Sequence, residues 1–489
     1  MYFIVIIAYI CYNNNILFPW RFVMVLWRHW LSVVEQLRPA CSRMRTFLWL
    51  SVCLAGMCIR PDIFGVTSIV RAFGLKDVFY DRLLDLFHSP SLNLGELTRR
   101  WVNAVVTVFP GVLTKNRRLL IVGDGLKIPK SGKKMPAVKL LHQESDSNTK
   151  PEYIMGHSCQ AVAILVGALQ SVFAVPVASR IHEGLFFSNR DTATLLDKML
   201  SLVDSLGLPS FYFIADAYYC ARKVMAPLLK KGNHLVSLVR MNAVAYMPAD
   251  VPSGKRKKGR PPLYGKKVKL RTLFDNPDAM QEAQSPVYGE INVLLRYRYA
   301  DLLIKRIGIM VRFVAVIHPT RGRRILMSTD LSLPPLDIID LYGLRFKIEV
   351  SFKQAVRTIG SYAYHFWMKA MTPVRKASGD QYLHRKSDAY RMAVRRKLAA
   401  YHRFIQVGLI AQGLLQYLSI SFPSIVWAKF GSWLRTVRPG IPPSEYVTSL
   451  ALRNSFPDFL SGLPSDATFA KFLIDRIDFR KNNPFRLAA

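Results

Sequence analysis

The chain has 489 residues, and its Lys and Arg residues outnumber Asp and Glu by 68 to 32, which gives a formal net charge of +36. With 51% hydrophobic residues, the composition excludes wholesale disorder and is typical of roughly two to four folded domains. The charge excess is too large for solubility alone, and it predicts a polyanionic partner, either nucleic acid or an anionic membrane surface.

The N-terminal stretch MYFIVIIAYICY (residues 1–12) is apolar but short of the ~20 residues that a spanning helix needs, and it lacks the basic region of a signal peptide. Three asparagines and a second candidate start at Met24 follow it, so we expect residues 1–23 to lie outside the functional fold. A second apolar stretch, residues 161–179, contains Gln170 and Pro176 and is typical of two buried strands joined by a turn. We therefore expect no membrane partner.

Residues 24–115 have the pattern of a helical, basic domain, which we predict to bind DNA. Within it, residues 65–88 suggest a helix-turn-helix with Thr67 as N-cap and Gly74 at the turn. The second helix would then present three side chains to DNA: Lys76, Tyr80 and Arg82. A plain helical hairpin fits the same pattern, and the sequence leaves both interpretations open.

From residue 116 to residue 240 the periodicity becomes strand-like, in RRLLIVGDG, SCQAVAILVG, VFAVPVASR and FYFIADA, before a helix and a further strand. This order predicts a mixed sheet of α/β type. Residues 241–334 are predicted to be a β-rich block, residues 335–375 to carry a helix that returns to the sheet, and residues 376–489 to be helical and basic. The cysteines form no CxxC pair, which favours buried, reduced thiols and a cytoplasmic setting.

The run KRKKGRPPLYGKKVKLR, residues 255–271, holds nine basic residues and no acid. We predict that it follows the DNA backbone through phosphate contacts, with an arginine between glycine and proline that could enter a minor groove. The contacting residues would be Lys255, Arg256, Lys257, Lys258 and Arg260. A solvated basic loop is the alternative.

In LYGLRFKIEVSFKQ, four polar side chains with spacings of three, four and four fall within about 80° on one helical stripe. They are Tyr342, Arg345, Glu349 and Lys353. Two aspartates, Asp124 and Asp216, each follow a buried-looking strand. Each acid has an ordinary explanation: a turn residue for Asp124, an N-cap for Asp216, and ion pairs with Arg345 and Lys353 for Glu349.

Together, however, two strand-borne aspartates and one helix-borne glutamate are the oxygen ligands needed to hold divalent metal over a phosphodiester. Two ions about 3.5–4 Å apart can activate the nucleophile and stabilise the leaving oxygen, and Mg²⁺ prefers such hard oxygen ligands. We therefore predict that Asp124, Asp216 and Glu349 are catalytic metal ligands. Asp330 is a competing acid, which we interpret as a strand-end or N-cap residue. His142 and His157 are interpreted as structural, because neither has a Cys or His partner at metal-ligand spacing.

This arrangement resembles the DDE transposases of bacterial insertion sequences, in the cut-and-paste branch marked by a Tyr-x2-Arg-x3-Glu-x6-Lys signature. Tyr342, Arg345 and Glu349 match the signature, whereas the position of its lysine is taken by Val356, with Lys353 and Arg357 nearby. The segments LIVGDGLKIPKSGKKM, FYFIADAYY and KGRPPLYGKKVKL are also similar to the family in order and spacing.

The resemblance implies an RNase H-like core with a β insertion before the Glu-bearing helix, and two Mg²⁺ or Mn²⁺ ions. It implies cleavage of double-stranded DNA at inverted-repeat ends, strand transfer into target DNA, and a dimer in a nucleoid-associated synaptic complex. Tyr342, Arg345, Lys353 and Arg357 would then contact the DNA. Two alternatives stay open: a metal-dependent nuclease of the same fold without strand transfer, and an inactive DNA-binding protein derived from a transposase.

Overall fold

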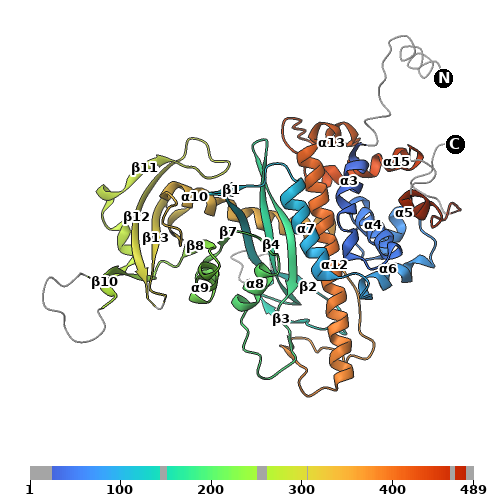
Figure 1. Ribbon diagram of the computed structural model, residues 1–489, viewed down its shortest axis with the longest axis horizontal. Helices are drawn as coiled ribbons and strands as arrows, with labels where there is room; N and C mark the ends of the chain where they lie inside the picture. Colours follow the sequence, from blue (N-terminus) through green and yellow to red (C-terminus); the bar gives the residue numbers. More distant parts are fainter. Residues whose placement is uncertain (1–24, 144–150, 250–261, 306, 463–467, 481–489) are drawn as a thin grey trace, which may run out of the picture.

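The computed structural model describes residues 25–143, 151–249, 262–305, 307–462 and 468–480 (Figure 1). The expected N-terminal extension, residues 1–23, lies outside the described residues. So do five of the predicted DNA contacts: Lys255, Arg256, Lys257, Lys258 and Arg260.

One large mixed sheet runs through the middle of the molecule, and its backbone hydrogen bonds follow the order β10-β9-β12-β13-β14-β8-β7-β2-β4-β3. Strands β1, β11 and β5 pair with β2, β12 and β4, respectively. The half that bears Asp124, which we call the catalytic half after the prediction for this residue, contains β1 (Thr114–Lys115), β2 (Arg118–Pro129), β3 (Lys139–His142), β4 (Tyr153–Ala168), β5 (Ser171–Ile181), β7 (Phe211–Ala215) and β8 (His234–Val239). The other half contains β9 (Val244–Pro248), β10 (Tyr264–Lys269), β11 (Gln281–Gln284), β12 (Leu294–Ile304), β13 (Ile309–His318) and β14 (Gly322–Ser328).

Five strands form the part of the sheet that positions the site, in the order β5-β4-β2-β7-β8. The pairs β5–β4 and β4–β2 are antiparallel, whereas β2–β7 and β7–β8 are parallel. Residues 161–179 form most of the β4–β5 hairpin, with its turn at Leu169 and Gln170, so the prediction of two buried strands is confirmed. The mixed α/β sheet flanked by helices is also as predicted.

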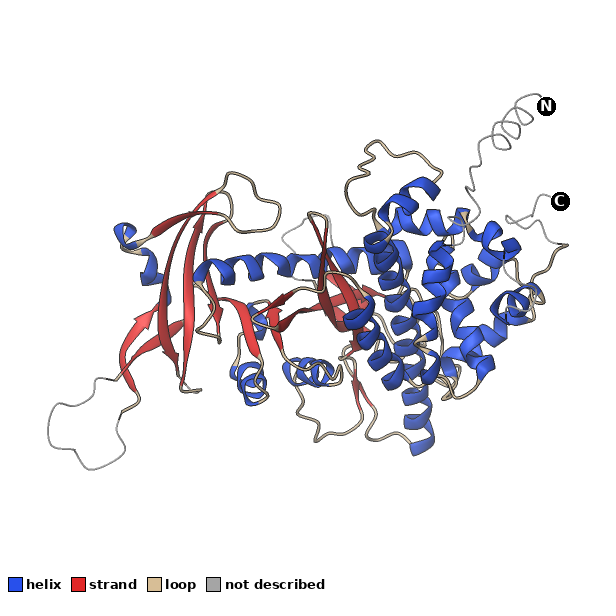
Figure 2. Ribbon diagram, turned by 45° about the horizontal axis from the view of Figure 1, so that its top comes forward, coloured by secondary structure: helices blue, strands red, loops and turns tan. Residues whose placement is uncertain are grey.

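Strands β9 to β14 lie within residues 241–334, and they continue the sheet that bears Asp124. Strand β14 pairs with β8 from Ile325↔Val239 to Ser328↔Val236, so its backbone bonds join the two halves. Figure 2 shows the β-rich half at one end of the molecule and a body of helices at the other.

The body of helices combines the N-terminal and C-terminal regions, which the sequence placed in separate domains. Helix α12 lies across it and packs on α4, α7, α14 and strand β5. The N-terminal helices are α3 (Val25–Glu35), η1 (Arg38–Ala40), α4 (Met44–Ile59), α5 (Thr67–Phe73), α6 (Phe79–His88) and α7 (Leu94–Val108). The C-terminal helices are α12 (Asp388–Ser421), α13 (Pro423–Lys429), α14 (Glu445–Asn454), α15 (Phe456–Gly462) and α16 (Thr468–Ile474).

The remaining helices flank the sheet or connect its strands. They are α8 (Leu195–Asp204), η2 (Ala217–Tyr219), α9 (Arg222–Lys230), η3 (Leu270–Phe274), η4 (Pro277–Ala279), α10 (Pro335–Gly343), η5 (Leu344–Phe346), α11 (Lys347–Gln354) and the π-helical turn η6 (Ala355–Ile359). A small two-stranded sheet pairs β6 (Leu185–Phe186) with β15 (Gln381–Tyr382).

Helix α12 has 34 residues and, among the described helices, is the one long and apolar enough to cross a membrane. Its most apolar 18-residue window is 94% buried inside the protein, as expected of a core helix. The five described cysteines are free, and four of them are buried. This agrees with the expectation of reduced, buried thiols.

Two local predictions were wrong. Helix α5 is preceded by Val66 at its N-cap and has no side-chain cap, so Thr67 is its first residue and not its cap. Asp124 does not end its strand, because β2 continues to Pro129 and pairs with β4 over its whole second half. The predicted turn at Gly74 is confirmed, with a left-handed backbone at φ 59°.

Candidate active site

Asp124 and Asp216 lie side by side on two adjacent parallel strands. Gly123 of β2 pairs with Ala215 of β7, and each aspartate is the next residue along its chain. Neighbouring strands are about 4.8 Å apart, so this register places the two backbones close together with their side chains on the same face. Val122 and Ile214 lie two residues before the aspartates, so their side chains are on the same face of the sheet as the carboxylates. They pack with Ile338 of α10 and Ile348 of α11, so both aspartates are on the face that these helices cover.

Each aspartate is held by the backbone that follows it. The Gly125 N–H donates to Asp124 Oδ1 at 2.8 Å, and the Ala217 N–H donates to Asp216 Oδ1 at 2.7 Å. Asp216 is thus an N-cap, as the ordinary explanation held, but it caps the short helix η2 and not the later helix α9. The Gly-Asp-Gly sequence around Asp124 is not a turn. Gly123 is required there because a Cβ would lie 2.5 Å from the Phe213 ring.

Glu349 reaches the same region from helix α11, which packs on β2 and β5. Helices α10, η5 and α11 form a nearly continuous rod that can be followed from the β-rich end toward the body of helices (Figure 2). The rod ends in the π-helical turn η6, whose last carbonyl, that of Ile359, accepts from the buried Arg60 guanidinium. Such π turns are frequent at functional sites because they locally change the helical register.

Arg345 links two of the carboxylates. Its Nη1 donates to Asp124 Oδ2 at 2.9 Å, and its Nη2 donates to Glu349 Oε1 at 2.6 Å. Because the guanidinium is a small planar fork, these two bonds keep the accepting oxygens within about 8 Å of each other. The Arg345 side chain is 17% exposed, compared with 53% for Glu349. The ordinary ion pair predicted for Glu349 is therefore present, and it extends to Asp124.

A cavity of about 560 Å³ brings all three acids together. Its lining includes Asp124, Asp216 and Glu349, with Gln160, Tyr219 and Phe352 around them. Beyond Glu349 a second hollow of about 520 Å³ is lined by three cations: Lys127, Lys353 and Arg357. Lys353 and Arg357 are exposed there, on either side of Val356, so two cations flank the position where the signature expects its lysine.

Burial shapes the charge of this cavity. It raises the pKa of Asp124, and the neighbouring Asp216 and Glu349 raise it further, while Arg345 and the Gly125 N–H act in the opposite direction. Burial also raises the pKa of Tyr342 to about 12, and Tyr342 is close enough to feel the charges of Arg345, Asp216 and Asp124. The site thus holds more negative charge than Arg345 compensates.

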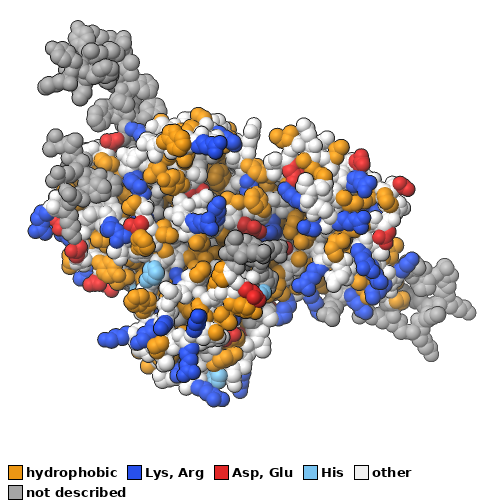
Figure 3. All heavy atoms as spheres, turned by 180° about the vertical axis from the view of Figure 1, so that it is seen from behind, with side chains coloured by type: hydrophobic (Ala, Val, Ile, Leu, Met, Phe, Trp, Pro, Cys, Tyr) orange, Lys and Arg blue, Asp and Glu red, His pale blue; other side chains and the backbone are white. Residues whose placement is uncertain are grey.

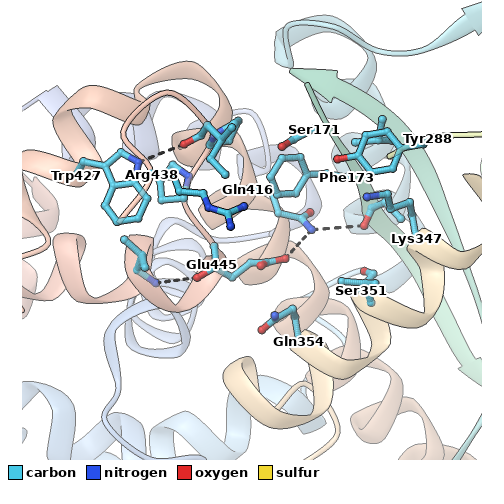
Figure 4. Close-up of a pocket in the computed structure, with 18 of the residues that line it drawn as sticks. Ser171, Phe173, Tyr288, Lys347, Ser351, Gln354, Gln416, Trp427, Arg438 and Glu445 are labelled. Carbon is cyan, nitrogen blue, oxygen red and sulfur yellow. Dashed lines mark hydrogen bonds between the residues drawn. The ribbon is translucent and has the colours of Figure 1, made fainter. Parts of the chain in front are cut away.

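One buried amide, that of Gln412, anchors the opposite face of α11, next to a pocket where Figure 4 labels Ser351, Gln416 and Glu445. Gln412 of α12 donates from Nε2 to the Ser351 carbonyl and hydroxyl oxygens, both at 3.1 Å. One turn further along, Gln416 Nε2 donates to Glu445 Oε1 at 2.9 Å. Glu445 is fully buried, and burial raises its pKa. A cavity of about 390 Å³ lies on this side, and Lys347 at its edge stands 3.7 Å from the centre of the Tyr288 ring.

The residues interpreted as structural behave as such. Asp330 accepts from the Tyr212 hydroxyl and the Ser332 N–H, at the end of β7 remote from Asp216. His157 is fully buried between the Tyr364 hydroxyl and the Pro136 carbonyl. His142 is exposed and lies near Glu152.

The predicted helix-turn-helix residues lie in the body of helices, away from the acids. Lys76 Nζ donates to the Asp475 carbonyl oxygen at 3.1 Å, and Arg82 forms an exposed pair with Asp85. Three acids, Asp77, Asp81 and Asp85, share this segment with the two cations. The predicted DNA contact of α6 stays a prediction.

The donor chemistry of the site fits a hard divalent cation, since all three acids line one cavity and offer carboxylate oxygens. Within the described residues, however, no three acids are gathered closely enough to ligate one ion as they stand. Asp124 and Glu349 are held apart by Arg345, because its guanidinium lies between their carboxylates. The contact of Gln412 with Ser351 and that of Arg345 with Asp124 were not recognisable from the sequence, whereas the i, i+4 spacing predicted the Arg345–Glu349 pair.

A mixed sheet thus carries Asp124 and Asp216 in register, and Glu349 of α11 lines the same cavity. Comparison with protein families matches residues 36–299, more than half of the chain, to the family described as "DDE superfamily endonuclease". The chain belongs to the DDE superfamily of endonucleases.

No curated protein matches the chain. Among solved structures, it is similar to a chain of the "Cryo-EM structure of piggyBac transposase synaptic complex with hairpin DNA". That similarity covers 96% of this chain and 86% of the other, at 11% sequence identity and a TM-score of 0.32.

Proposed function

We propose that the protein is a cut-and-paste transposase. It cleaves double-stranded DNA at the inverted-repeat ends of a mobile element and joins the freed 3′-hydroxyl to target DNA. The observation that carries this proposal is that Asp124, Asp216 and Glu349, far apart in sequence, line one cavity beside a hollow that exposed cations line. Membership of the DDE endonuclease superfamily supports the cleavage step.

Asp124, Asp216 and Glu349 would hold Mg²⁺ or Mn²⁺, as one ion or two. When bound, the metal supplies charge neutralisation and activation of the attacking oxygen. The chain itself fixes the donors: β2 and β7 set the two aspartates in register, and the buried amide of Gln412 holds α11 from behind. Tyr219 and Phe352 narrow the cavity around the acids, which limits the access of water.

The cations beside the acids are suited to the scissile backbone. Lys127, Lys353 and Arg357 line the hollow that opens next to Glu349, and phosphate oxygens are their natural partners. Arg345 would also contact a phosphate once it leaves the carboxylates, and Tyr342 would pack near the cleaved end. Two protomers would hold two DNA ends in the same complex, in a nucleoid-associated setting.

The test uses isosteric variants of the three acids: Asp124→Asn, Asp216→Asn and Glu349→Gln. We expect each to abolish Mg²⁺-dependent cleavage of an end-containing duplex while the dissociation constant for that duplex changes less than about threefold. Asp330→Asn is the matched control, since this acid lies at the other end of β7. Full cleavage by any of the three variants would remove that acid from the catalytic set.

A gel assay for joined end–target product separates strand transfer from hydrolysis. A product that contains the target strand covalently joined to the element end supports the transposase. Cleavage without any joined product would instead establish a nuclease of the same fold. DNA binding without cleavage at any Mg²⁺ or Mn²⁺ concentration would establish an inactive binder.

A further inference from the structure

A separate lobe projects from the sheet at the N-terminal end of α12, at the bottom of Figure 1. We call it the basic lobe and define it as residues 127–142, 183–187 and 366–397. Its own small core consists of Met368, Met371, Leu383 and Val394. Backbone bonds tie its segments together, with the Met368 N–H donating to the Lys134 carbonyl at 2.9 Å and the Leu140 N–H to the Ser378 carbonyl at 2.7 Å.

The lobe carries a concentrated excess of exposed positive charge. Its described acids, Glu183, Asp380 and Asp388, are all ion-paired, to Lys139 and Arg391. Eight further cations are exposed and form no ion pair with any described residue: Lys133, Lys369, Arg375, Lys376, Arg385, Lys386, Arg395 and Arg396. Figure 3 shows Lys and Arg side chains gathered over this lower part of the surface. Such a cluster repels itself, so it is stabilised by an anionic partner.

Large aromatic side chains are exposed among these cations. Trp367 is 65% exposed and Tyr382 is 60% exposed. Arg395 adds a guanidinium 4.4 Å from the centre of the Phe187 ring. Lys and Arg clustered on one face are typical of surfaces that bind nucleic acid, and exposed rings among them can pack on the sugars of a duplex, whose base faces are already stacked.

The lobe is directly continuous with the strand that bears Asp124. Strand β2 passes through Asp124 and Lys127, ends at Pro129 and leads into Lys133. At about 3.3 Å per residue, the lobe, which starts at Lys127, therefore begins roughly 10 Å along the strand from Asp124. The hollow lined by Lys127, Lys353 and Arg357 lies on this route. A DNA backbone that runs from the acids along β2 would first pass Lys127 and then the exposed cations of the lobe.

We propose that the basic lobe binds duplex DNA through its phosphates and so guides the helix that enters the acid-lined cavity. The guidance of DNA into the cavity rests on the proposed function, whereas the binding of DNA rests on the charge of the lobe. The N-terminal segment of α12, residues 388–397, is about 15 Å long, which corresponds to roughly four base pairs of B-form DNA. Duplex DNA is favoured over an anionic membrane because the lobe adjoins the acid-lined cavity and the hollow lined by Lys127, Lys353 and Arg357.

The experiment compares two full-length quadruple variants that lose the same charge. The lobe variant is Arg385→Ala, Lys386→Ala, Arg395→Ala and Arg396→Ala. The control variant removes four exposed cations outside the lobe: Lys230→Ala, Arg323→Ala, Arg324→Ala and Lys471→Ala. None of the eight forms an ion pair within the described residues, and thermal unfolding of each variant verifies its fold. The probe is a 40-base-pair duplex titrated at several salt concentrations.

We expect the lobe variant to bind the duplex about tenfold more weakly at physiological salt and to lower the slope of log K against log salt by about two to four. In the control variant, the slope should decrease by less than half as much as in the lobe variant. Equal losses in the two variants, or no loss in the lobe variant, would overturn the proposal. Binding to phosphatidylserine vesicles that depends on the lobe, with duplex binding that does not, would also overturn it.

Cleavage by the wild type is measured in parallel. If the wild type fails to cleave with Mg²⁺ or Mn²⁺ while the lobe variant still loses duplex binding, the lobe proposal stands and the proposed catalytic function fails. If the wild type cleaves while the lobe variant binds and cleaves as the control does, the lobe proposal fails and the proposed catalytic function stands.

Discussion

Arg345 Nη1 lies 2.9 Å from Asp124 Oδ2 while Nη2 of the same guanidinium lies 2.6 Å from Glu349 Oε1, so one cation neutralises two of the three acids. A divalent ion that binds Asp124 and Glu349 together must displace this guanidinium. The released side chain would then be free to meet a phosphate. In the proposed mechanism, metal binding and DNA binding would therefore both involve Arg345.

Arg345→Gln should therefore strengthen metal binding in the absence of DNA. Removing the internal cation leaves Asp124 and Glu349 without their shared partner, so we expect the affinity for Mn²⁺ to rise about three- to tenfold. Mn²⁺ titration followed by electron paramagnetic resonance measures this directly. Arg357→Gln, which removes a nearby exposed cation with no ion pair among the described residues, is the control. Unchanged Mn²⁺ affinity in Arg345→Gln would show that the pair does not compete with metal.

The two glycines beside Asp124 should respond differently to alanine. In Gly123→Ala the new Cβ would lie 2.5 Å from the Phe213 ring, inside the core, and overpacking of this kind costs about 1–3 kcal/mol. In Gly125→Ala the nearest atom is the Cys159 carbonyl oxygen at 3.7 Å, which is an ordinary contact. We expect urea denaturation to show a loss of stability for Gly123→Ala alone. Equal stability of the two variants would contradict the packing described for β2.

The anchoring of α11 can be separated from general stability. Gln412→Leu removes the amide that donates to Ser351 of α11, whereas Gln416→Leu removes a similar amide that donates to Glu445 instead. Each loss of a buried hydrogen-bond partner costs about 1–3 kcal/mol, so both variants should unfold at lower temperature. Only Gln412→Leu should also slow cleavage under saturating DNA, because Glu349 is on the helix that it releases. Equal cleavage rates in the two variants would reject the anchoring role.

Stability should fall as the pH is lowered from neutrality, because several histidines are buried in their neutral form. Burial lowers the pKa of His157 to about 3 and that of His182 to about 4. Both pKa values lie below the value of about 6.5 for histidine in the unfolded chain. As the pH falls, the unfolded chain therefore binds protons that the folded chain does not bind. The stabilising contribution is complete above pH 6.5 and is lost as the pH falls toward these lower values.

His157→Gln should flatten this pH dependence. Glutamine can still hydrogen-bond Tyr364 but does not titrate, so the slope of unfolding free energy against pH between 6 and 5 should fall by up to about 1.4 kcal/mol per pH unit. Denaturant unfolding at several pH values gives the slope. His142→Gln, at an exposed histidine on β3, is the matched control. A slope that His157→Gln leaves unaltered would mean that His157 takes up a proton in the folded protein.

The acids could be predicted from the sequence because strand and helix periodicities are local. A strand fixes which face a side chain occupies, and a helix fixes its angle, so Asp124, Asp216 and Glu349 were recognisable from their own segments. The register that sets Gly123 opposite Ala215 could not be predicted, since it depends on β7 pairing with β2 after an intervening hairpin and helix. The same is true of the contact between Gln412 and Ser351, which joins residues on separate helices.

The errors have equally physical causes. Gly-Asp-Gly resembles a turn because glycine favours turns, but here Gly123 allows the Phe213 ring to approach the strand closely. The basic lobe gave no periodic signal, because the segment between η6 and α12 has little regular structure and is shaped by backbone bonds to residues 133–140. Separate N-terminal and C-terminal domains were expected because they are distant in sequence, and α12 unites them by packing against both.

The pairing of β14 with β8 also limits how this protein can change shape. Backbone bonds cross the junction between the β-rich half and the catalytic half, so these two parts cannot rotate as independent bodies about a flexible joint. Any rearrangement during a reaction cycle must be accommodated by bending or coiling of a shared β surface. A load placed on the far strands would then be transmitted mechanically through β8 to β7, and so to the backbone that positions Asp216.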